Sequence, residues 1–140
     1  MKTTLLVGAS ALAFILATPG AALADGECGN PDVSSDPNVV SCVSDPGRYP
    51  AGITYNQASY ATPAGIRLDL YGTLVVNATT SPVAVRAIGS VNQQAIITAR
   101  TGSRFTASDT GLSATASGSG LASVDSRGTV SAGLDRKSVV

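Results

Sequence analysis

The stretch GSRFTASDTGLSATASGSGLASVDSRGTVSAG, residues 102–133, decides the fold class. Its glycine landmarks recur in steps of nine, nine and eight residues, at Gly102, Gly111, Gly120 and Gly128. Between them lie nearly uncharged runs of small and aliphatic residues, which predict strands of about five residues joined by glycine turns. Three such strands fill the 26 residues from Gly102 to Gly128. This self-similarity predicts one coil of a parallel β-helix.

The same stretch alternates apolar and polar residues at period two, as half-buried strands do. We expect these side chains to face inward: Phe105, Ala107, Leu112, Ala114, Ala116, Val130 and Ala132. We expect these to face outward: Arg104, Thr106, Ser113, Thr115 and Ser131. Upstream, residues 51–101 alternate in the same way, so the repeats are predicted to cover residues 51–134 as two to three coils. A small antiparallel β-sandwich is the alternative, because hairpin spacing overlaps with this pattern.

The first 24 residues have the pattern of a secretory signal peptide. Lys2 precedes an apolar run, Leu5–Leu16, and small residues follow up to Ala24. The run is shorter than the roughly 20 residues that a membrane-spanning helix needs, so we expect cleavage between Ala24 and Asp25. We expect no transmembrane segment in the mature chain.

Residues 25–50 form a Pro-, Asp- and Ser-rich segment that we interpret as an N-terminal cap. It holds the two cysteines of the chain, Cys28 and Cys42. Export would place them in an oxidising compartment, which favours a disulfide. Two free thiols or half of a metal site are the alternatives, and the lack of histidine leaves too few ligands for zinc.

Three phrases resemble the passenger repeats of bacterial autotransporters and related haemagglutinin-like adhesins: GTLVVN (72–77), GLSATA (111–116) and GTVSAG (128–133). The resemblance covers about half of the chain. It implies a right-handed parallel β-helix displayed at the outer membrane of a Gram-negative bacterium or outside the cell, with a structural or adhesive role. It also implies a glycan or cell-surface ligand and an outer-membrane translocator barrel as partner. Passengers have many more coils than this chain, and the barrel is missing from it, so we interpret the chain as an N-terminal fragment.

The final residues, 135–140, interrupt the pattern. From Asp135 they read DRKSVV, which GATCGGAAGAGCGTCGTG can encode, and with a following TAG that string resembles a common sequencing adapter. We therefore expect an artefactual tail on a truncated gene. A genuine short polar tail is the alternative.

Composition argues against several function classes. The chain has no histidine, and removal of Lys2 with the leader leaves nine acidic against eight basic residues with no basic patch, so no nucleic-acid partner is expected. We expect no catalytic residue, no cofactor and no metal site, although Asp109 and Asp135 stand one predicted coil apart. The alternative function is a secreted β-helix lyase or hydrolase acting on carbohydrate.

Overall fold

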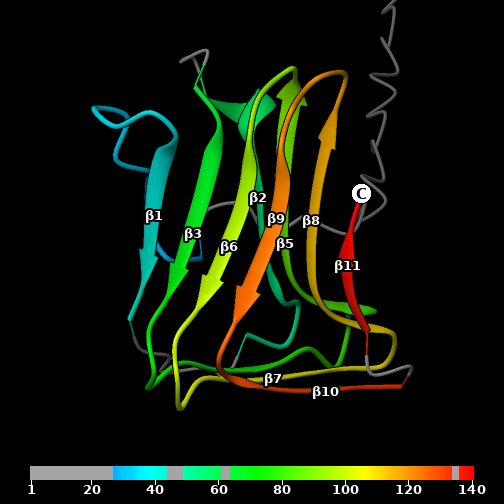
Figure 1. The fold of residues 1–140 in the computed structure, drawn as a ribbon. Helices are drawn as coiled ribbons and strands as arrows, with labels where there is room; N and C mark the ends of the chain where they lie inside the picture. Colours follow the sequence, from blue (N-terminus) through cyan, green and yellow to red (C-terminus); the bar gives the residue numbers. More distant parts are fainter. Residues whose placement is uncertain (1–26, 44–48, 61–63, 134–135) are drawn as a thin grey trace, which may run out of the picture.

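The structure, a computed structural model, describes residues 27–43, 49–60, 64–133 and 136–140. In these ranges the chain is all-β, with one short 3₁₀ helix, η1 (Gln57–Ser59). The strands are β1 (Asn38–Cys42), β2 (Ile53–Asn56), β3 (Ile66–Leu70), β4 (Val75–Asn77), β5 (Val83–Val91), β6 (Ala95–Ala99), β7 (Arg104–Ala107), β8 (Thr110–Ser117), β9 (Ala122–Ser126), β10 (Thr129–Ala132) and β11 (Arg136–Val139). They form the solenoid of about three turns in Figure 1.

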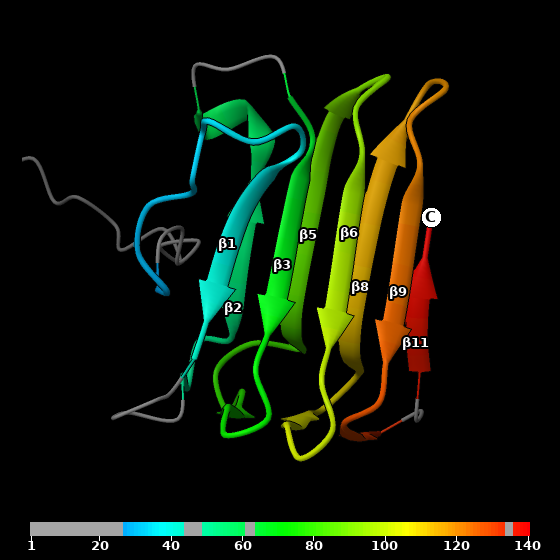
Figure 2. The same ribbon diagram turned by 60° about the vertical axis from the view of Figure 1, so that its left-hand side comes forward.

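Three parallel sheets make the walls of the solenoid. We call them sheet I (β1-β3-β6-β9), sheet II (β4-β7-β10) and sheet III (β2-β5-β8-β11). Each full coil gives one strand to each sheet in turn, and successive coils lie side by side with a right-handed winding (Figure 2). Because every pairing between these strands is parallel, the predicted parallel β-helix is confirmed and the antiparallel sandwich is wrong.

Strand register gives the true length of a coil. In sheet II, Val76 pairs with Phe105 and Phe105 pairs with Val130. The first step is therefore 29 residues and the second is 25, against the 26 predicted from glycine spacing. The turns absorb the difference, because the strands themselves keep matched partners.

The core is a set of side-chain stacks running along the solenoid axis. Leu68 lies between Val40 and Ile97 in register, and all three are buried. Four of the residues predicted to face inward are also buried: Phe105, Ala107, Leu112 and Ala114. The other three are partly buried: Ala116, Val130 and Ala132.

One predicted orientation is wrong in its consequence. Ser113 was expected to be exposed, yet it retains only 9% of its accessible surface. It sits on central strand β8, in register with Arg86 of β5 on one side and with β11 on the other. Arg104, Thr106 and Ser131 are exposed as predicted, and Thr115 is half-buried.

Close backbone approach explains the glycine landmarks. At Gly102 φ is +97°, in the left-handed region that favours glycine. A β-carbon there would lie 2.7 Å from the carbonyl oxygen of Gly72, one coil earlier, and a β-carbon on Gly72 would overlap the carbonyl oxygen of Thr101. The turns of successive coils therefore stack so tightly that a side chain does not fit between them.

Two predicted boundaries look different in the structure. Strand β1 lies inside the predicted cap, residues 25–50, but pairs with β3 over its full length, so the solenoid begins before residue 51. Strand β11 lies inside the predicted tail, residues 135–140, and pairs with β8 with one register shift. The foreign origin of that tail stays a prediction.

Leu68→Ala is expected to lower the free energy of unfolding by about 2–5 kcal/mol, because the cavity would open in the middle of a stack. Val75→Ala is the matched control, since Val75 is 37% exposed on β4 and should cost less than about 1 kcal/mol. Chemical denaturation of both variants measures the difference. Equal losses would contradict the stacked core.

Candidate functional site

A disulfide ties the N-terminal segment to the first coil. Cys28 and Cys42 are bonded, with their Cα atoms 5.1 Å apart, which confirms the predicted pairing. Cys42 is the buried last residue of β1, so the bridge fastens the segment directly to sheet I. Because disulfides persist in oxidising compartments, the bridge indicates a non-cytoplasmic location. The predicted cleavage site, Ala24 and Asp25, lies outside the described residues.

Tyr55 of β2 provides a second attachment, which sequence reasoning missed. The backbone N–H of Cys28 donates to the Tyr55 hydroxyl oxygen at 2.8 Å, and that hydroxyl donates to the carbonyl oxygen of Gly29 at 2.8 Å. The ring itself is fully buried in the core. Tyr55 thus joins the cap to the wall opposite the one that the disulfide reaches.

A small turn shapes the cap between these anchors. Asp32 and Val39 form an antiparallel bridge, and the N–H and hydroxyl of Ser34 both donate to the Asp32 carboxylate. The hydroxyl and then the backbone bond lower the pKa of this exposed carboxyl below its ordinary value of 3.8. These bonds therefore hold at neutral pH and are lost only as the pH falls through that lowered value.

The outer face of sheet I carries the densest group of charged side chains among the described residues. One in-register row consists of Ser41, Asp69, Thr98 and Asp125. The next outward row lies just beyond the strand ends and contains Tyr71, Arg100 and Arg127, and we call these three residues the arginine row. Backbone hydrogen bonds extend the ladder through it, from Arg100 N–H to Leu70 O at 2.9 Å and from Arg127 N–H to Ala99 O at 2.8 Å.

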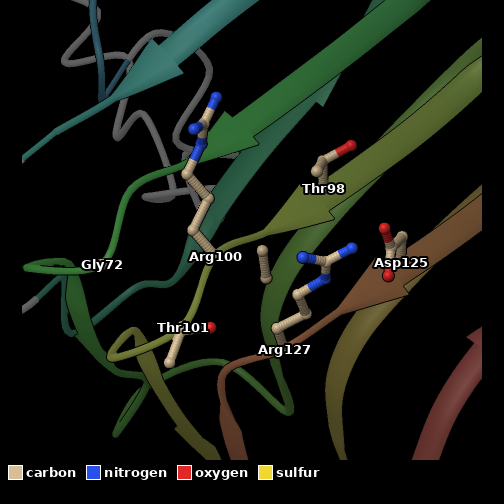
Figure 3. A pocket seen from close by; sticks show the side chains of 7 residues that line it. Gly72, Thr98, Arg100, Thr101, Asp125 and Arg127 are labelled. Carbon is tan, nitrogen blue, oxygen red and sulfur yellow. The ribbon is translucent and has the colours of Figure 1, made fainter.

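An open hollow of about 500 Å³ lies where these rows meet the turn into sheet II. Its volume falls in the range of small-ligand sites. Figure 3 shows the side chains of Thr98, Arg100, Asp125 and Arg127 around it, with Gly72 and Thr101 at the turns. The Arg127 side chain extends from its strand end toward Asp125, and Arg100 extends toward the end of β3.

The charges around the hollow are unequally satisfied. Arg67 Nε lies 2.9 Å from Asp69 Oδ1, so this carboxylate has a cationic partner. The Arg100 guanidinium carbon stands 4.6 Å from the centre of the Tyr71 ring, in a cation–π contact. In the ranges that the structure describes, neither Arg100 nor Arg127 has a carboxylate within 4 Å. The arginine row therefore presents two guanidinium groups whose N–H donors are open to a ligand.

The acidic pair considered from the sequence is not brought together as a described site. Asp109 is exposed in the turn between β7 and β8, and its backbone N–H donates to Pro82 O at 3.1 Å. Asp135 lies outside the described residues. Among the residues that are described, no group of three His, Cys, Asp or Glu side chains is placed to hold a metal ion.

No helix in the described ranges combines the length and apolar character that crossing a bilayer would require. No known protein family matches the chain, and the comparisons with curated proteins and with solved structures gave no match either.

Replacing both cysteines, Cys28→Ser with Cys42→Ser, is expected to lower the free energy of unfolding by about 3 kcal/mol, since the bridge closes a loop of about 15 residues. Denaturation of the reduced wild type is the control for the buried serine that the variant introduces at position 42. Coincident transitions of oxidised and reduced wild type would contradict a stabilising bridge.

Tyr55→Phe is expected to lower the free energy of unfolding by about 1–3 kcal/mol, because the buried ring stays while the Cys28 N–H and the Gly29 carbonyl lose their partner. Tyr71→Phe is the matched control, since that ring lies on the outer face. Amide hydrogen exchange at Cys28 should accelerate only in the first variant. Unchanged exchange there would show that the phenol does not hold the cap.

Proposed function

We propose that the chain is a fragment of an exported, surface-displayed passenger of the autotransporter type, with a structural or adhesive role. The observation that carries the proposal is the architecture itself: a parallel β-solenoid whose outer walls are rows of short polar side chains, closed at its first coil by a disulfide-tied cap. Such solenoids present extended surfaces built from repeated coils. The disulfide agrees with export, and the repeat phrases of the sequence agree with the passenger class.

The adhesive mechanism follows from surface rather than from a catalytic centre. Along sheet II, the outward row Asn77, Thr106 and Ser131 repeats one short polar side chain per coil. Parallel strands lie roughly 4.8 Å apart, so the row offers hydrogen-bonding groups at a regular interval. Regular polar rows suit the hydroxyl-rich surface of a glycan or of another cell.

A secreted carbohydrate-active enzyme of the β-helix type is the second candidate. The observation in its favour is the hollow on sheet I, where the Asp125 carboxylate and two guanidinium groups line one space. A carboxylate can take up a proton, and arginines can stabilise a developing negative charge. Turnover of a polysaccharide by the purified chain would support this candidate against the adhesive one.

The export step is tested by expressing the full chain in a Gram-negative host. We expect mass spectrometry to find a mature protein that begins at Asp25 and carries an oxidised Cys28–Cys42 pair. Leu12→Arg, which interrupts the apolar run of the leader, is the control and should leave the chain cytoplasmic and reduced. Cytoplasmic accumulation of the wild type would overturn export.

The adhesive step is tested with the purified mature chain on immobilised neutral and acidic glycans. We expect saturable binding that the soluble glycan competes away, with no release of shortened sugars over hours. Binding that stays unsaturated on every surface, or sugar release, would contradict the adhesive role.

A further inference from the structure

We propose that the arginine row binds the acidic groups of a glycan, carboxylate or sulfate, with the sugar ring resting in the adjoining hollow. This deepens the proposed adhesive function and rests on it. The step beyond that function is the chemical class of the ligand, an anionic rather than a neutral glycan, and the residues that select it.

The two arginines are arranged as a pair of anion donors. Arg100 and Arg127 occupy the same position on neighbouring coils, so their Cα atoms are separated by about one strand spacing, roughly 4.8 Å. Guanidinium groups bind carboxylate and sulfate through two parallel N–H donors. Two such groups on consecutive coils can hold one acidic group each, or both can hold one group between them.

Stacking on Tyr71 orders the first of these arginines before any ligand arrives. With its guanidinium carbon 4.6 Å from the ring centre, Arg100 uses a face of its planar group for the ring and keeps its N–H edges available. A side chain that is already ordered loses less conformational entropy on binding. The contact therefore favours recognition by geometry over simple charge attraction.

The neighbouring charges leave the hollow with an excess of positive charge. Asp69 is satisfied by Arg67 within sheet I, which makes that pair neutral toward a ligand. Asp125 is the acidic side chain that lines the hollow, set against Arg100 and Arg127. Its carboxylate must repel an anion, so its removal has a predictable sign.

The uncharged lining fits a sugar better than a bare anion. Thr98 and Thr101 contribute hydroxyl groups that can both donate to and accept from sugar hydroxyls. A nucleic acid is a poorer fit, because the basic residues of the chain are scattered singly and form no extended stripe.

The test is titration calorimetry of the oxidised mature chain with four probes: hyaluronan oligosaccharide for carboxylate, dextran sulfate for sulfate, neutral dextran, and single-stranded DNA of matched length. We expect at least one acidic glycan to bind and neutral dextran to bind at least about tenfold more weakly, the factor that one lost charge-assisted hydrogen bond gives. Which acidic glycan binds more tightly separates carboxylate from sulfate recognition.

Variants locate the site. Arg100→Gln with Arg127→Gln should weaken binding of the acidic glycan by about tenfold or more, whereas Arg104→Gln, an exposed arginine on sheet II, should leave it unchanged. Asp125→Asn should strengthen binding several-fold, because it removes the repelling charge. The Asp125 variant keeps the test decisive if the double arginine variant fails to fold, as its thermal transition would reveal.

Several results would overturn the inference. These are tighter binding of DNA than of either acidic glycan, equal binding of neutral dextran, equal losses in the Arg104→Gln control, and no gain in Asp125→Asn. Equal binding of neutral and acidic glycans would overturn the inference while leaving the adhesive function standing. Absence of binding to every glycan and cell surface would overturn both.

Discussion

The rest of the structure depends on parallel hydrogen bonding between coils, which sets successive turns of the chain about 4.8 Å apart. At that spacing each inward side chain must rest on the equivalent side chain of the next coil. The stack of Val40, Leu68 and Ile97 satisfies this requirement in sheet I. The same spacing leaves no room for a β-carbon between the turns at Gly72 and Gly102. Core, turns and register are thus consequences of one repeat distance.

A stack needs protection where it begins. The first coil receives it from the disulfide at Cys42 and from the Tyr55 hydroxyl, which hold the preceding segment against two different walls. A buried side-chain hydrogen bond from Asn38 to Gln57, 3.3 Å long, joins the first coil to η1. Buried polar groups are stable when they are hydrogen-bonded in this way. The cap is therefore part of the fold rather than an appendage to it.

Outward positions are free of the packing requirement, and chemistry can gather there. In-register stacking that places aliphatic residues in the core also places Asp69, Thr98 and Asp125 in one row outside, with Arg100 and Arg127 in the next. Residues 27 to 29 apart in the chain become nearest neighbours. A solenoid can in this way build a charged hollow from side chains that look isolated in sequence.

The sequence by itself determined the β class, the parallel coil of roughly 26 residues, the inward set from Phe105 to Ala114 and the cysteine pair, because glycine spacing, period-two alternation and thiol count are local properties of the chain. Only the tertiary structure decided the burial of Ser113, the role of Tyr55 and the grouping of Tyr71, Arg100 and Arg127. These depend on which residues share a register, and turn lengths that vary between 25- and 29-residue coils set that register. A one-residue change in a turn moves every outward side chain to the other face of its strand, so spacing alone could not place them.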